Sequence, residues 1–63
     1  MNNNSFYNLV ALLHVLQKNL YQIDEYYLPQ ATNEEERVFY RNLKMDHENH
    51  IKELTQLLGE HIK

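Results

Sequence analysis

Apolar residues in the first half of the chain recur at spacings of three and four, the period of an amphipathic helix. They are Phe6, Leu9, Val10, Leu13, Leu16, Leu20, Ile23 and Tyr27. Ser5 or Asn4 can accept a hydrogen bond from a free backbone N–H at the start of this segment. At its other end, Pro29 is expected to exclude Leu28 from helical geometry because the proline ring collides with the preceding residue. The pattern predicts a helix over about 5–28.

The same spacing resumes after a predicted turn over 29–32. Thr32, followed three residues later by Glu35, has the form of a capping box, in which two side chains satisfy free backbone N–H groups. The apolar residues that follow are Phe39, Leu43, Ile51, Leu54, Leu57 and Leu58. Gly59 is of the residue type that most often follows a helix end. We predict a second helix over about 33–58, antiparallel to the first because the turn is short.

The chain is too small to be stabilised by one hydrophobic core alone. A single core in a domain of this size contributes only about 3 to 5 kcal/mol, and the absence of cysteine excludes disulfides and Cys-based zinc or redox sites. The apolar stripe of the first helix extends from Leu12 and Ile23 to Val10 and Tyr21, which is more than one neighbouring helix covers. We therefore predict an all-α fold: residues 1–63 form one antiparallel two-helix hairpin, and two hairpins pair into a four-helix bundle.

The charge of the chain argues against two classes of partner. The net charge is −3 and the pI about 5.7, with Lys and Arg scattered along the chain, so neither nucleic acid nor an anionic membrane is expected. Residues 1–5 lack the basic segment of a signal peptide, and His14 interrupts the apolar stretch from Leu9 to Leu16. A cytoplasmic protein is the expectation.

Several polar residues lie on the predicted apolar faces. At 100° per residue, His47 and His50 both point inward from the second helix, and Asp46 lies on the rim. Gln17 lies within the stripe of the first helix and His14 at its edge. If the helices reverse at the predicted turn, residues whose numbers add up to about 61 lie at the same height. His14 would then face His47, with Gln17 within one turn of both.

This polar layer has two interpretations. Imidazole nitrogen binds Zn, Cu, Fe and Ni, and an i,i+3 spacing lets two rings converge on one ion. The predicted metal ligands are His47 and His50, helped by His14, Gln17 and Asp46. In the alternative, the histidines form a hydrogen-bonded layer with Gln, Tyr and water that fixes the register of the bundle. Both satisfy inward polar groups, which otherwise cost about 1 to 3 kcal/mol each.

The segment 46–54 resembles the second metal-binding helix of ferritin-like proteins, which carry a Glu on one helix and E-x-x-H on the next. The resemblance is to the encapsulated, half-length ferritins, and it implies two hairpins that complete a four-helix bundle and bind iron; zinc is the alternative metal. His50 matches the family histidine, whereas Gln17 and His47 stand where carboxylates are expected. Without the bridging carboxylates, ferroxidase chemistry is in doubt. The chain also shows no nucleophile–base pair, so an enzyme is not expected.

The metal-binding dimer would act in storage, sensing or structure. The main alternative is a metal-free interaction or regulatory module, a dimeric bundle whose outer face binds another protein. The architecture also resembles that of the plasmid-encoded repressors of primer, hairpins that dimerise and bind RNA. The basic residues that could form such a face are Arg37, Arg41, Lys44 and Lys52. Because most of them are interleaved with carboxylates, RNA binding is the least favoured function.

Two residues near the helix ends have structural predictions. Asp24 lies on the apolar face at the predicted height of Arg37 and within one turn of Arg41. We expect an ion pair between Asp24 and one of these arginines, clamping the turn. His61 follows Gly59 and is expected in a frayed tail.

Overall fold

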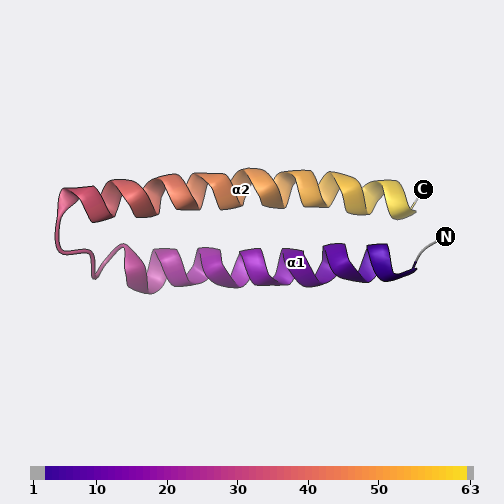
Figure 1. The fold of residues 1–63 in the computed structure, drawn as a ribbon, viewed down its shortest axis with the longest axis horizontal. Helices are drawn as coiled ribbons and strands as arrows, with labels where there is room; N and C mark the ends of the chain where they lie inside the picture. The colour runs from indigo at the N-terminus through magenta and orange to yellow at the C-terminus, as the bar shows by residue number, and fades with distance from the viewer. Residues whose placement is uncertain (1–2, 63) are drawn as a thin grey trace.

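The computed structural model describes residues 3–62 and shows an antiparallel helical hairpin, which confirms the predicted all-α fold. Helix α1 comprises Asn3–Gln22, a π-helical segment η1 comprises Ile23–Tyr27, and helix α2 comprises Glu34–Ile62. The two long helices lie side by side, and the start of α1 and the end of α2 lie at the same end of the hairpin (Figure 1). No strand occurs in the described residues.

The first helix ends in a widened turn. The Leu28 N–H donates to the Ile23 carbonyl at 2.9 Å, five residues earlier, which is the π-helical pattern. Leu28 keeps helical angles, with φ −63° and ψ −49°, so the expectation that Pro29 excludes it from helical geometry is wrong. A wider turn moves the preceding carbonyls away from the proline ring, and Pro29 has no N–H that the turn could leave without an acceptor. The chain can therefore remain helical up to the proline.

The second helix is capped one residue later than the sequence predicted. The Glu36 N–H donates to the Asn33 side-chain oxygen at 2.8 Å, which makes Asn33 the N-cap. The Glu36 carboxylate accepts from the Thr32 N–H at 2.7 Å and from the Thr32 hydroxyl at 2.9 Å. These two donors, the backbone N–H first, hold the pKa of Glu36 below its usual range. The predicted Thr32–Glu35 pairing is wrong, because Thr32 pairs with Glu36 and the Asn33 side chain accepts from the Glu36 N–H.

A narrow seam holds the helices together. Most of its residues follow the alternating three and four spacing of coiled-coil packing, with one interval of seven between Tyr40 and His47. From α1 and η1 they are Phe6, Leu9, Leu13, Leu16, Leu20 and Ile23, and from α2 they are Tyr40, His47, Ile51, Leu54, Leu58 and His61. Only Ile23 and Leu54 are buried, with 1% and 6% of their surface exposed, among the described residues. The other seam residues keep one side open to solvent.

The register of the hairpin differs from the predicted one. The Phe6 and His61 rings lie 5.9 Å apart and the Tyr27 and Tyr40 rings 5.7 Å apart, measured between centroids. The numbers of facing residues therefore add up to about 67 and not to 61. The cause is the connection over 28–33, which continues past the end of the first helix before the chain reverses (Figure 1). α2 is thus displaced by several residues from its expected position.

This displacement also changes the ion pair near the turn. Asp24 accepts from the Lys44 ammonium at 2.8 Å, and this contact raises the pKa of Lys44. The predicted clamp between Asp24 and Arg37 or Arg41 is wrong, because in the observed register those arginines lie nearer to the turn than Asp24 does. Both side chains of the observed pair are partly exposed, so we assign the pair to orientation more than to stability.

The second helix continues beyond its predicted end at 58. Gly59 lies inside α2 without a positive φ, and the helix extends to Ile62. His61 is half-buried against Phe6 and does not lie in a frayed tail. The packing of His61 against Phe6 stabilises the last turn of α2, which Gly59 itself does not favour.

Replacing Asn33 with alanine removes the N-cap of α2. We expect the free energy of unfolding to fall by about 1 kcal/mol, which lowers the Tm by about 4 to 8 °C for a domain of this size. Thermal denaturation followed by circular dichroism measures the shift. The matched control is Asn49→Ala at an exposed position inside α2, where no loss is expected. Equal Tm values for the two variants would rule out Asn33 as the cap.

Replacing Gly59 with alanine should stabilise the protein. A Cβ built at Gly59 meets no atom within 4 Å, and the residue lies in a helix. We expect a gain of about 0.5 kcal/mol from the lower backbone entropy of alanine in the unfolded chain. Chemical denaturation measures it, with Ala11→Gly on the exposed side of α1 as the opposite change. A loss of stability in Gly59→Ala would show that the last turn of α2 does not form.

Candidate functional site

The structure does not gather the residues of the predicted polar layer. His47 lies half-buried in the seam, whereas His14, Gln17, Asp46 and His50 are exposed. In the observed register, His14 is level with residue 53 and not with His47. Within residues 3–62, no group of three or more His, Asp or Glu side chains is placed to hold a metal ion. Metal binding by these residues therefore stays a prediction, and one chain does not supply a complete ligand set.

Gln17 and His50 are level with each other but lie on different flanks of the hairpin. Gln17 is seven residues from Asp24, so both lie on the flank where Asp24 meets Lys44. His50 lies on the opposite flank, where it lines a hollow with Leu12 of α1. The seam separates the two side chains.

His47 is held in one orientation by its own helix. Its Nδ1 lies 3.0 Å from the Leu43 carbonyl oxygen, which can only accept, so in the neutral ring Nδ1 carries the proton. The Nε2 lone pair is then available to a ligand. Histidines that bind metals are commonly oriented in this way by a hydrogen bond from the other ring nitrogen.

Two adjoining hollows lie on the His50 flank. The larger, of about 390 Å³, is lined by Leu9, Leu12, Leu16, His50, Glu53, Leu54 and Leu57. The smaller, of about 340 Å³, lies toward the chain ends and is lined by Ser5, Leu9, Leu57, Glu60 and His61. Because Leu9 and Leu57 line both hollows, we call the combined surface the apolar groove.

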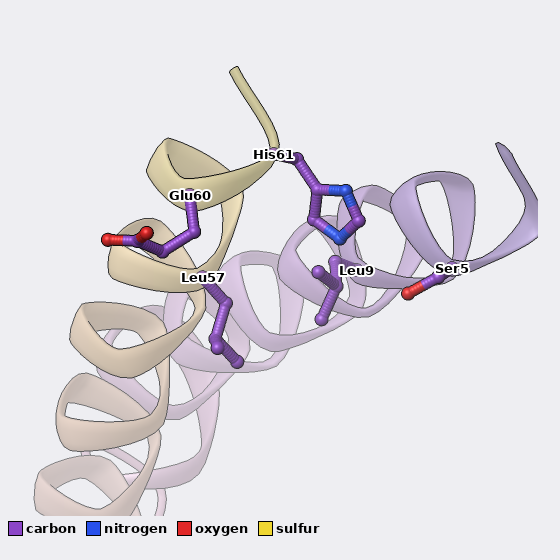
Figure 2. A pocket seen from close by; sticks show the side chains of 5 residues that line it. All are labelled: Ser5, Leu9, Leu57, Glu60 and His61. Carbon is purple, nitrogen blue, oxygen red and sulfur yellow. The ribbon is translucent and has the colours of Figure 1, made fainter. Parts of the chain in front are cut away.

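Figure 2 shows the end of the apolar groove, between the last turns of α2 and the first turns of α1. The side chains of His61 and Leu9 lie close together there, and the Glu60 carboxylate points away from them. The floor of the groove is therefore apolar, and its charged groups lie at the rim. A surface of this kind is suited to packing against another apolar surface, with polar contacts at the edge.

The acidic residues at the rim belong to α2. Asp46, Glu53 and Glu60 follow one another at intervals of seven residues and so lie along one side of the helix. Glu53 and Glu60 line the groove itself. The lining residues of α1 are leucines and Ser5, which carry no charge. One side of the groove is thus negative and the other neutral.

Part of this surface follows from the sequence. The wide stripe that includes Leu12 predicted apolar surface beyond the seam, and Leu12 indeed lines the groove. The prediction did not include Glu53 with the functional residues. Its spacing of three from His50 is the signal that could have found it, since residues three apart on a helix are neighbours.

The basic residues considered for RNA binding lie largely in ion pairs. Arg37 donates to Glu34 at 3.0 Å and Arg41 donates to the same carboxylate at 3.2 Å. The Arg37 hydrogen bond is the main cause that holds the pKa of Glu34 below its usual range. Arg37 and Arg41 thus share one carboxylate and Lys44 is paired to Asp24, so each of these three cations has an acidic neighbour.

No family model, curated protein or solved structure matches this chain. Neither described helix has the length and apolar character to cross a membrane.

Proposed function

We propose that this chain is a self-associating structural or interaction module, in which two hairpins pair through the apolar groove and complete a four-helix bundle. The observation that carries this proposal is the large apolar surface left uncovered by the seam. The large apolar side chains that remain exposed include Leu12, Val15, Tyr21, Phe39 and Leu57. Of these, Leu12 and Leu57 line the apolar groove, and a large exposed apolar patch on a small protein commonly marks an interaction site.

The amount of surface supports a partner of the same size. The hairpin exposes 5024 Å², whereas a compact monomer of 7.7 kDa exposes about 4300 Å². The excess, roughly 700 Å², is close to the ~800 Å² that each partner buries in a standard protein interface. The radius of gyration of 14.4 Å also exceeds the roughly 11 Å expected of a compact domain of this length. Side-by-side pairing of two such rods reduces both excesses.

A second copy fits the groove better than an unrelated protein for a geometric reason. The groove is formed by two antiparallel helices whose apolar residues follow coiled-coil spacing. A copy turned about a twofold axis presents the same ridge of leucines to the same groove, so one surface serves both partners. The product is the four-helix bundle that the sequence pattern favours.

Leu57→Glu tests the groove as the interface. Leu57 lines both hollows and is 51% exposed. A charge there would be buried without a partner in the dimer, so we expect the dimer to dissociate, with at least about a hundredfold weaker association. Sedimentation equilibrium measures this.

Met45→Glu is the matched control. Met45 also lies on α2, is 58% exposed and does not line the groove. This variant should remain dimeric with unchanged helix content. Dimers in both variants would contradict the proposed interface, and a monomeric parent protein would contradict self-association itself.

A metal-binding role is the second candidate, favoured by the orientation of His47. The hydrogen bond from Nδ1 to Leu43 leaves Nε2 available, and His50 lies one turn further along α2. Under this proposal the dimer is ferritin-like in architecture and binds iron or zinc in storage, sensing or structure. The proposal relies first on His47 and His50. His14 is level with residue 53 and Gln17 lies on the flank opposite to His50, whereas Asp46, four residues before His50 on α2, can still join them.

Metal analysis of protein purified without a histidine tag tests the second candidate. We expect iron or zinc in the parent protein and loss of most of it in His47→Ala/His50→Ala, since the two imidazoles are the proposed ligands. His61→Ala, which removes a histidine outside the proposed ligand set, should keep its metal. Equal metal contents in the parent and the double variant would exclude this role.

A further inference from the structure

We infer that His50 and Glu53, contributed by two paired copies of the chain, form a binding site for a divalent transition metal of the zinc class at the dimer interface. The inference rests on the proposed self-association and adds a specific ligand set to it. Glu53 takes the place of the residues that the sequence pattern suggested as partners of His50.

The two side chains are neighbours on one helix surface. His50 and Glu53 are three residues apart on α2, and both line the larger hollow of the apolar groove. Among the described residues, neither side chain makes a hydrogen bond or ion pair. Imidazole nitrogen and carboxylate oxygen are both ligands of zinc. One chain therefore presents two suitable ligands at one place in an otherwise apolar surface.

A second copy completes the site. No cluster of three metal-ligating side chains occurs within residues 3–62 of one chain, whereas zinc usually takes four ligands. In the proposed dimer, α2 packs against the α2 helix of the other copy about a twofold axis that passes between the larger hollow of one copy and the same hollow of the other. The site then contains His50 and Glu53 from both copies. Two imidazoles and two carboxylates then converge on one position. This site does not exist in the monomer.

Electrostatics favour a cation at this place. Asp46, Glu53 and Glu60 form an acidic row along one side of α2, and Glu53 and Glu60 of this row line the groove. In the paired arrangement two such rows approach each other, and like charges that face each other in an interface weaken it. The α1 residues that line the groove supply no positive charge. A divalent cation held by Glu53 of both copies would offset this repulsion and supply a partner for each buried His50.

The test is association measured with zinc chloride and, separately, with a chelator. For the untagged full chain we expect zinc to lower the dimer dissociation constant by at least about tenfold, with about one ion bound per dimer. Sedimentation equilibrium gives the first value and calorimetric titration the second. His50→Ala and Glu53→Gln should each abolish the zinc effect. The controls His14→Ala and Glu48→Gln, which change residues outside the groove, should retain it.

The outcomes separate this inference from the proposals on which it builds. A dimer in chelator whose dissociation constant zinc does not change would overturn the metal site and leave self-association intact. A monomer under both conditions would overturn both. Zinc bound at about one ion per chain, lost in His47→Ala but retained in Glu53→Gln, would place the metal in the seam and also overturn the inference.

Discussion

The contact between α1 and α2 is the interaction on which the rest of the structure depends. Each of two helices packed side by side can cover only one side of the other. The seam therefore buries Ile23 and Leu54 and leaves its other residues partly exposed to solvent. The stabilisation that a core of this size contributes is small compared with the free-energy cost of the conformational entropy lost on folding. Burial of the apolar surface beside the seam is therefore needed for stability, and we propose that the pairing of two hairpins buries it.

The turn determines which residues share that surface. The π-helical segment carries the chain helically up to Pro29, and the Asn33 cap delays the start of α2. The connection between them continues past the end of the first helix before the chain reverses, and this path sets the register in which Phe6 meets His61 (Figure 1). Had the chain reversed directly at the end of the first helix, His14 would have been nearly level with His47, as the sequence suggested. In the observed register His50 instead lies beside the leucines of α1, at the edge of an apolar groove. The few residues of the connection thus determine which polar side chains of the two helices lie near one another.

The fold could be predicted from the sequence because helix formation and packing depend on local spacing. The stripe from Phe6 to Ile23 and the short connection were sufficient to predict two antiparallel helices. The candidate site could not be predicted in the same way, because it depends on register. Register was determined by the path of the connection over 28–33, which continues past the end of the first helix (Figure 1), and the spacing of apolar residues within the helices does not specify that path. The partner of Asp24 changed for the same reason.

Self-association is the central claim, and the concentration dependence of folding tests it most directly. The parent protein would be unfolded by heat at concentrations from about 5 to about 500 µM in chelator, with circular dichroism as the signal. If two hairpins must pair to be stable, the Tm rises steadily with concentration, because mass action favours the folded dimer. A Tm that is the same at every concentration would show that one hairpin is stable alone, and it would contradict the account.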